Sequence, residues 1–600
     1  MAIVQLKKLT FCGLLREKSA ALEALQETGG SHLIPLNNTV AETPEIDTLF
    51  AEKTLSALKY LNSCANKRHQ VLAAKDFDLE RIVNASLDLQ TEIRNLMDER
   101  DAINKRIKEI EPWGNFQLPD KAQIGGLNLW FYIVPQRLLK KLSTEGLVWQ
   151  VVHRDNLRCY VVVIAKDEPS TASMPVPRTH TGVRSLDTLK NRLNEVELRL
   201  EDKQAKRESL TRWISLMTLQ LTQAQDQSVL TAAHHLTLDQ AGVFLIQAWV
   251  NESEVNKFKK FAQQHQLALL VADISSTDNP PTLLKNDPVV AGAEDLLSFY
   301  QTPNYYSWDP SIIVFWSVAV FFAMILSDAG YAALLSLYLA FKWRSLKQGM
   351  GRDMRMLMLV TLVFSMLWGV LIGSYFGYSA PEHSFIGKFK VLELQDFDSM
   401  MLLSIAVGVI HLTLSNLVMA YQRRAKITAY ASLGWAAITL GGFCLWRAHT
   451  LQIPWLQQGS YGVMGLGAFA VLCCSGDKPI HRLSDVAARF LEGLHGLTDI
   501  TKIFGNTLSY MRLFALGLAG ASLALTFNDL AVKVYHSLHG LGLLCSILIL
   551  LLGHSLNIVL CLISGVIHGL RLNFIEFFNW SLTEEGYPFK AFSKKNQPLK

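Results

Sequence analysis

Hydrophobic residues recur at seven-residue spacing in two stretches of the N-terminal half. The first stretch, residues 77–110, has this spacing at Ile82, Leu89, Leu96, Ile103 and Ile110, with Ile93 and Ile107 four residues after two of them. The second stretch, residues 186–217, has two seams, made by Leu186, Leu193, Leu200 and Ile214 and by Leu189, Val196, Leu210 and Met217, with Lys203 and Arg207 as interruptions. This pattern predicts a coiled coil over 77–110 and 184–226, and the alternative is a packed helical bundle within one domain.

Between and around these heptads, short apolar runs predict two α/β lobes. Residues 128–136, 147–153 and 159–165 are typical of strands and fall in a far lobe, 113–183. The near lobe, 1–75 and 230–300, has a strand–helix–strand order over 7–36 and again over 242–273. If the two long helices pair antiparallel, the N-terminal half is a two-lobed α/β dumbbell with a coiled-coil shaft.

The C-terminal half changes to long apolar stretches, at 311–341, 356–377, 399–421, 430–446, 460–474, 497–527 and 541–578. A membrane needs about 20 such residues per helical crossing. The first stretch is too long for one crossing and contains the polar residues Ser327 and Asp328. Splitting it there gives an all-α membrane domain of about eight transmembrane helices over 301–600, preceded by a cytosolic domain over 1–300.

Charge supports this division. Residues 1–300 contain 72 Asp, Glu, Lys and Arg and residues 301–600 contain 37, while the net charge of +5 gives no reason to expect nucleic-acid binding. With eight crossings, 15 Lys and Arg lie in loops and tail on one side, against Lys388, Lys390, Arg447 and Lys533 on the other. Because positive loops stay inside and the N-terminus lacks a signal peptide, we expect both termini in the cytosol.

Other features limit the chemistry. The eight cysteines form no C-x-x-C pair, which is typical of free thiols in a reducing compartment rather than of a metal site. The phosphate-binding motif G-x-x-x-x-G-K-[ST] is missing from the sequence, so we expect no ATP site in this chain, and we expect no cofactor and no metal.

Two arginines lie in the apolar stretches. Arg512 is near the middle of 497–527, where a charge costs about 2.5–3.5 kcal/mol on insertion scales. Such a residue faces a water-filled cavity or an anionic partner, or it pairs within the bundle. Arg571 lies about 30 residues into the last stretch, where snorkelling to the interface is a stronger alternative.

Polar residues share the last helix with Arg571. His568, Ser564 and Arg571 lie on one face, and Asn557 and His554 continue polar positions toward the other surface. They predict an aqueous path, or else interhelix hydrogen bonds. Glu576 comes five residues after Arg571, which is a poor spacing on an α-helix. We therefore expect the counter-ion of Arg512 to come from another subunit rather than from this chain.

The order of these segments resembles the membrane stator subunit, called subunit a or subunit I, of V-type and archaeal-type rotary ATPases. NTLSYMRLFALGLAGASLA (506–524) and HGLRLNFIEFF (568–578) resemble that family's two arginine-bearing helices, and DPSIIVFWSVAVFFAMILSDAGYAALL (309–335) resembles its first membrane hairpin. WGVLIGSYFG, GVIHLTLSNLV and QAWVNESEVNKFKKF also fit, and the resemblance covers essentially the whole chain.

The resemblance implies a mechanism. A ring of proteolipid subunits, each with a buried carboxylate, rotates against this chain, and Arg512, aided by Arg571, meets that carboxylate between two half-channels for H⁺ or Na⁺. Candidate lining residues are His568, Ser564, Asn557, His554, Glu576, Ser509 and Asn506. Peripheral stalks attach to the soluble lobes, and separate subunits of the head hydrolyse or synthesise ATP. The short chain favours a bacterial or archaeal plasma membrane.

The sequence also departs from the family pattern. Ala248 and Asn251 stand where Gly and Pro are usual, Cys561 and His568 where many relatives have Glu or Gln, and Gly520 where some have His. These departures put the half-channel lining in question. The rival interpretations are a secondary transporter, which usually has two related membrane halves, and a coiled-coil membrane receptor.

Overall fold

The computed structural model describes the chain apart from residues 1–2, 38–47, 75–76, 117–123, 140–146, 171–172, 180–184, 276, 345, 347–350, 382, 385–386, 395, 477–482, 539, 583 and 596–600. The loop cations Lys347, Lys478, Arg482 and Lys600 lie outside the described residues. Two compact units are formed: one contains residues 1–14, 30–34 and 241–591, and the other contains residues 15–29, 35–240 and 592–600.

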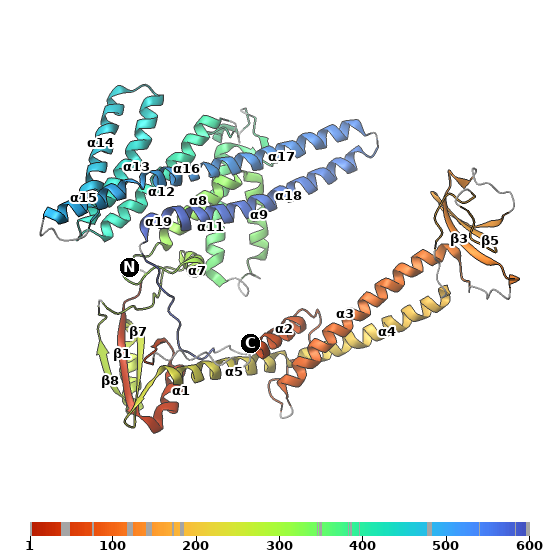
Figure 1. The fold of residues 1–600 in the computed structure, drawn as a ribbon, viewed down its shortest axis with the longest axis horizontal. Coiled ribbons are helices and arrows are strands. Elements are labelled where there is room, and N and C mark those ends of the chain that lie inside the picture. Colours follow the sequence, from red (N-terminus) through yellow and green to blue (C-terminus); the bar gives the residue numbers. More distant parts are fainter. Residues whose placement is uncertain are drawn as a thin grey trace. The chain divides into compact units, whose positions relative to one another are not determined.

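The second unit is mainly helical (Figure 1). Its elements are α1 (Lys18–Thr28), α2 (Thr48–Asn62), α3 (Leu79–Ile110), β3 (Asn128–Pro135), β4 (Val148–Arg154), β5 (Arg158–Ala165), α4 (Leu186–Leu210), α5 (Ile214–Leu236) and β6 (Leu238–Gln240). The second coiled-coil segment was predicted over 184–226; within it, α4 begins at Leu186, and Ser185 caps this helix by accepting a hydrogen bond from the Thr188 N–H.

Helices α3 and α4 pack in opposite directions. Arg192 Nη2 lies 2.7 Å from Glu99 Oε1, and Lys203 Nζ lies 2.5 Å from Glu92 Oε2. Residue numbers therefore rise on one helix as they fall on the other. Leu89, Ile93 and Leu200 are buried between them, as the heptads predict. Knobs-into-holes packing over the predicted 77–110 and 184–226 shaft stays a prediction.

The interruption of the second heptad has a physical reason. Helix α2 packs beside this part of α4, and the Arg207 guanidinium stacks on the Tyr60 ring, 4.1 Å from its centroid. Arg207 Nη2 also donates to the Tyr60 carbonyl oxygen at 2.7 Å and to Ser63 Oγ at 2.8 Å. A cation at the C-terminal end of α2 satisfies carbonyl groups that have no partner inside the helix.

The three predicted strands of the far lobe form one antiparallel sheet in the order β3–β5–β4. Alternate residues of β5 face its core, where Cys159, Val161 and Val163 are fully buried. Trp113 closes the core by edge contacts with Phe131 and Tyr160. The period-two burial explains why short apolar runs located these strands correctly.

The first unit contains the second predicted sheet. Four of its strands are β1 (Leu6–Leu14), β2 (Ser31–Ile34), β7 (Val243–Asn251) and β8 (Ala268–Ala272), in the antiparallel order β2–β7–β1–β8. Helix α6 (Val255–Gln264) buries Phe258 and Phe261 against Phe11 of β1. These elements form where the sequence predicts them, whereas a domain division at residue 300 stays a prediction.

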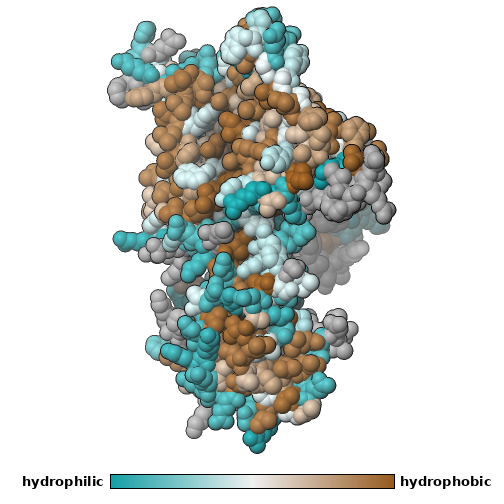
Figure 2. Space-filling view, turned by 90° about the vertical axis from the view of Figure 1, so that its left-hand side faces the viewer, coloured by the Kyte–Doolittle hydropathy of each residue, from teal (hydrophilic) through white to brown (hydrophobic). Residues whose placement is uncertain are grey.

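The rest of the first unit is the apolar helical half, where hydrophobic side chains cover much of the surface (Figure 2). Its elements are α7 (Ala291–Tyr300), α8 (Ser311–Leu326), α9 (Ala329–Lys342), α11 (Gly351–Ile372), β9 (Ser374–Tyr375), β10 (Tyr378–Ser379), α12 (Phe397–Gln422), α13 (Thr428–Thr450), α14 (Pro454–Cys474), α15 (Leu483–Leu497), α16 (Ile500–Ser509), α17 (Met511–Ser537), α18 (Gly542–Arg571), the π-helical segment Leu572–Phe577 and α19 (Phe578–Ser581).

Among the described residues, five helical stretches are long and apolar enough to cross a membrane: 353–372, 397–422, 428–450, 486–537 and 542–581. The chain is a multi-pass membrane protein. Helices α8 and α9 are apolar but shorter, and they are separated at Ser327, whose φ of 45° ends α8. The polar break is therefore confirmed, while eight crossings and the cytosolic termini stay predictions.

Two apolar stretches differ from their predicted bounds. Helix α14 begins at Pro454, six residues before the predicted start, because proline suits the first helical position whatever the hydropathy there. The stretch 497–527 is not one helix: α15 ends at Leu497, α16 ends at Ser509, and α17 continues to Ser537.

Candidate functional site

The break between α16 and α17 places Arg512 in the first turn of α17. Tyr510, between the two helices, is fully buried, and its hydroxyl lies 2.8 Å from His411 Nδ1 on α12. A Cβ added to Gly408 of α12 would lie 2.6 Å from the Tyr510 ring. The close approach of α12 therefore fixes the position of this junction.

The π-helical segment places Glu576 beside Arg571. In a π-helix the hydrogen-bond spacing is five residues, so a side chain five positions on returns to nearly the same face. Arg571 Nε lies 3.9 Å from Glu576 Oε1, and the Glu576 side chain is 3% exposed. The prediction that this spacing is unsuitable for pairing was wrong, because it assumed α-helical geometry.

Ser509 joins Glu576 to Arg512. The Ser509 hydroxyl donates to Glu576 Oε1 at 2.6 Å, and Arg512 Nη2 donates to Ser509 Oγ at 3.0 Å. The expectation that this chain supplies no carboxylate near Arg512 is therefore corrected. The buried Glu576 carboxylate is linked to Arg512 through the Ser509 hydroxyl, and it contacts Arg571 directly.

Several polar atoms of this cluster are buried without a hydrogen-bond partner among the described residues. They are Arg512 Nη1, Glu576 Oε2, His568 Nδ1 and Asn506 Nδ2. His568 also interacts electrostatically with both arginines. Because buried polar groups normally have partners, these atoms keep hydrogen-bonding capacity that the described residues do not fill. Arg512, Arg571, Glu576, Ser509 and His568 thus lie in one cluster, and their role in ion translocation stays a prediction.

The other predicted residues of the last helix lie in a different network. His554 Nδ1 lies 2.7 Å from the Tyr331 hydroxyl, and its Nε2 lies 3.1 Å from Asn528 Oδ1. Asn557 donates to the Tyr331 hydroxyl at 3.0 Å and to the Gly520 carbonyl oxygen at 2.8 Å. These are the interhelix hydrogen bonds that the sequence analysis left as the alternative. Ser564 is half-buried between the two groups.

Asp328 anchors the loop next to this network. Its carboxylate caps α9 by accepting from the Tyr331 N–H at 2.9 Å, and it also accepts from Ser374 Oγ at 2.8 Å. The Phe376 and Gly377 N–H groups add bonds of 3.0 and 2.9 Å. The polar break is visible in the sequence, but the network of Asp328, Tyr331 and Asn528 is not, because most of its hydrogen bonds join residues that are distant in sequence.

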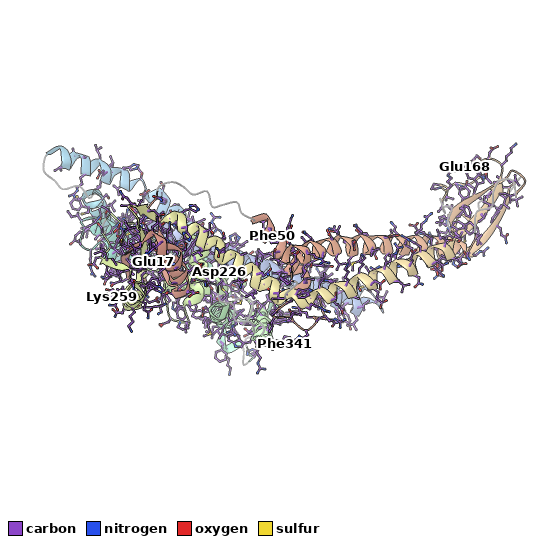
Figure 3. The ribbon with its side chains drawn as sticks, turned by 90° about the horizontal axis from the view of Figure 1, so that it is seen from below. Glu17, Phe50, Glu168, Asp226, Lys259 and Phe341 are labelled. Carbon is purple, nitrogen blue, oxygen red and sulfur yellow. The ribbon has the colours of Figure 1, made fainter. Side chains whose placement is uncertain are left out.

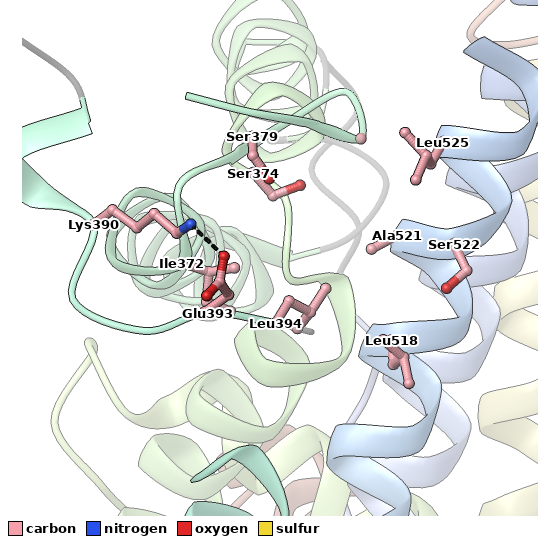
Figure 4. A pocket seen from close by; sticks show the side chains of 11 residues that line it. Ile372, Ser374, Ser379, Lys390, Glu393, Leu394, Leu518, Ala521, Ser522 and Leu525 are labelled. Carbon is pink, nitrogen blue, oxygen red and sulfur yellow. Dashed lines mark hydrogen bonds and ion pairs between the residues drawn. The ribbon is translucent and has the colours of Figure 1, made fainter. Parts of the chain in front are cut away.

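A small polar cavity lies further along α17 (Figure 4). Its volume is about 60 Å³, and it is bounded by residues within 372–379 and 390–394 and by Leu518, Ala521, Ser522 and Leu525 of α17. Lys390 and Glu393 form an ion pair of 2.9 Å at its edge. The sequence analysis counted Lys390 only as a loop charge, since a cavity formed by a loop and a helix has no periodic signal.

No protein-family model matches the chain. Among curated proteins, the V-type ATP synthase subunit I of Chlamydia pneumoniae is 26% identical over 91% of this chain and 89% of its own length. The V-type ATP synthase subunit I of Chlamydia trachomatis is 27% identical over 99% of this chain and 100% of its own. The A-type ATP synthase subunit I of Pyrococcus horikoshii is 28% identical over 59% of this chain and 54% of its own.

One solved structure, the crystal structure of the cytoplasmic N-terminal domain of subunit I, homolog of subunit a, of V-ATPase, covers 44% of this chain and 99% of that chain, with 14% identity and a TM-score of 0.22. The two chlamydial relatives span nearly the whole chain, and they have the name that the arginine-bearing segments predict. The chain is therefore similar over nearly its whole length to proteins named V-type ATP synthase subunit I, the family that its sequence resembles.

Proposed function

We propose that this chain is the membrane stator subunit of a V/A-type rotary ATPase. Two findings support the proposal: its curated relatives are named subunit I of such complexes, and its C-terminal half has helices long and apolar enough to cross a membrane. In this role it carries ions past a rotating ring of proteolipid subunits, while partner subunits catalyse the ATP reaction.

The observation that carries the proposal is the cluster of Arg512, Ser509 and Glu576. Arg512 keeps Nη1 without a partner among the described residues, so the guanidinium has a donor to offer to a carboxylate on the ring. A positive charge there stabilises the ionised carboxylate and so favours release of its ion. The same charge opposes direct passage of cations between the two sides of the membrane.

The α17–α18 hairpin provides the surface for the ring. The two helices run side by side (Figure 1), and α18 exposes a row of apolar residues that includes Leu548, Leu552, Leu556 and Val559. Arg571 ends the same helix with its side chain 49% exposed. An apolar face ending in an exposed cation suits a sliding contact with apolar helices that each contain one acidic group.

We propose that two sets of polar residues line routes toward this contact. One set is Asn506, Ser509, Glu576, His568 and Ser564. The other lies at the cavity that Ser522 shares with residues 372–379 and 390–394. We assign these routes as the two half-channels, with His554 and Asn557 holding the helices between them. Both soluble sheets remain candidates for attachment of the peripheral stalks.

The test is ATP-driven ion uptake into vesicles that contain the purified complex, with a proton-sensitive dye and with labelled Na⁺ in parallel. Arg512→Gln should abolish uptake of whichever ion the wild type transports, while subunit content on a gel stays unchanged. Arg424→Gln is a matched control, because Arg424 is an exposed cation at the end of α12.

Uptake by the Arg512→Gln complex at the wild-type rate would overturn the role of Arg512. Purification under mild detergent distinguishes the rival interpretations. A stator should bring proteolipid and stalk subunits with it, whereas a secondary transporter or a receptor should bring neither.

A further inference from the structure

A surface groove lies at the C-terminal end of α9, where α9 packs against α11. Its volume is about 480 Å³, and its lining includes Leu339, Phe341 and Leu359, with Trp343 and Arg344 at one end. Phe341 is 83% exposed and projects from α9 (Figure 3). The groove is distant in sequence from the arginines of the proposed translocation site and takes no part in that mechanism.

The end of the groove next to Trp343 is positively charged. Lys342 and Arg344 are exposed. Arg355 of α11 is 5% exposed, and its guanidinium stacks on the Trp343 ring, 4.9 Å from the centroid. The ion pairs found among the described residues include none that joins these three cations to a carboxylate.

Arg355 has unsatisfied hydrogen-bonding capacity at this position. Its Nη1 donates to the Trp343 carbonyl oxygen at 3.0 Å, but its Nε is buried without a partner among the described residues. A buried charge of this kind is costly unless it is paired. A nearby anion would lower that cost, and the groove that Trp343 lines is where such an anion has room.

The rest of the groove is lined mainly by Leu339, Ala340, Phe341 and Leu359, and further exposed apolar residues lie on the preceding turns of α9. Leu337 is 73% exposed and Leu334 is 47% exposed, both on a helix of the membrane half. An aromatic residue such as Trp343 is typical of the level where lipid headgroups meet the hydrocarbon. The feature therefore combines a cationic end at the interface with an apolar channel directed along a helix.

We propose that this groove binds one phospholipid with a negatively charged headgroup. The phosphate lies against Arg344 and Lys342 and within reach of Arg355, and an acyl chain fills the groove beside Leu339 and Phe341. Charge complementarity selects the headgroup, and the apolar walls select a lipid over a free phosphate ion. The proposal needs only the membrane location of α9 and α11, so it does not rest on the proposed rotary function.

Native mass spectrometry of the purified full-length chain in its complex tests the proposal. Phosphatidylglycerol and phosphatidylcholine are titrated separately, and we expect phosphatidylglycerol to bind about tenfold more tightly, as attraction to two or three cations implies. The double variant K342Q/R344Q changes only exposed side chains and should lose that preference. The matched control R423Q/R424Q removes two cations from the end of α12 and should keep it.

Two further measurements distinguish a bound anionic lipid from a free phosphate ion. Inorganic phosphate at millimolar concentration should leave the bound lipid in place, and Ala340→Trp, which fills the groove, should weaken lipid binding without changing the charge. Equal binding of the two lipids, equal loss in the control variant, or displacement by inorganic phosphate would each overturn the proposal.

Discussion

At the scale of single residues, Ser509 has the central place in the candidate site. Its hydroxyl is donor to Glu576 and acceptor for Arg512, so it keeps two opposite charges close without a direct ion pair. A direct bidentate pair would occupy both ends of the guanidinium. The bridge instead leaves Arg512 Nη1 without a partner among the described residues.

Replacing this hydroxyl should weaken transport. In Ser509→Ala, Glu576 loses a hydrogen bond to a charged group, which is worth about 1.5–3 kcal/mol. We expect ATP-driven uptake to fall by roughly tenfold or more while assembly is preserved. Uptake by vesicles of equal subunit content measures the effect.

Ser460→Ala removes the same atom from α14, where the hydroxyl donates to the Leu456 carbonyl oxygen at 2.8 Å, and is the matched control. A drop of equal size in both variants would mean that the hydroxyl of Ser509 has no particular role.

Much of this cluster could be predicted from residue types alone. Arg512 and Arg571 are conspicuous because charge is rare in apolar helices. The partnership of Glu576 could not be predicted, because it depends on a local change of helix type that residues 572–577 do not announce by composition. The hydrogen bonds of Tyr331 and Asn528 depend on contacts across more than 25 residues, which spacing on one helix cannot reveal.

At the scale of elements, the join between α8 and α9 is held by Asp328. Four donors converge on this buried carboxylate, two of them backbone N–H groups of the segment after α11. Two short helices and a loop are thereby locked together. A buried charge is tolerated there because its acceptor capacity is filled by hydrogen bonds.

Asp328→Asn should destabilise the membrane half. An amide offers one acceptor oxygen instead of two, so bonds such as those from Ser374 and Gly377 lose their acceptor. With about 1.5–3 kcal/mol for each bond to a charged group, we expect the melting temperature of the detergent-purified complex to fall by roughly 5 °C or more.

Asp529→Asn, at an exposed position of α17, makes the same chemical change and should have little effect. An unchanged melting temperature in Asp328→Asn would contradict the role given to the carboxylate. Differential scanning calorimetry of both variants provides the comparison.

Element bounds were predicted well where burial follows a period. The heptads located α3 and α4, and the apolar runs located β3, β5 and β7 within a few residues. The predictions failed where hydropathy does not decide a boundary, as at Pro454 of α14 and at Tyr510, where a buried tyrosine separates two helices.

At the scale of the whole molecule, the segment after the last helix returns to the sheet of the first unit. The Thr282 N–H donates to the Tyr587 carbonyl oxygen at 2.9 Å, and the Phe589 N–H donates to that of Thr282 at 3.1 Å. The Lys590 N–H then donates to His32 Nδ1 at 2.9 Å. This last bond needs a neutral imidazole, because a protonated ring has no acceptor nitrogen.

The docking of this segment should depend on pH. Burial lowers the pKa of His32 below the usual value of about 6.5. The docked form therefore has its full stability above that value and loses stability as pH falls below it. The exchange rate of the Lys590 amide hydrogen, divided by its intrinsic rate at each pH, should rise as the pH falls from 7.5 to 5.5.

His32→Phe keeps an aromatic ring beside Tyr587 and Phe589 but removes the titrating nitrogen. In this variant the corrected exchange should no longer depend on pH. His153→Phe, at an exposed position of β4, should behave as the wild type does. A wild-type protein with pH-independent exchange would contradict the assigned role.

The π-helical segment also has a consequence for chain length. Loss of one residue between Arg571 and Phe577, with the helical hydrogen-bond pattern otherwise kept, would rotate the remainder of the helix by about 100° around its axis. Glu576 would leave Ser509, and Phe577 would leave the His411 ring, on which it stacks at 4.3 Å. The number of residues in this stretch is therefore fixed by the contacts on either side of it. A substitution here is far easier to accommodate than the gain or loss of a single residue.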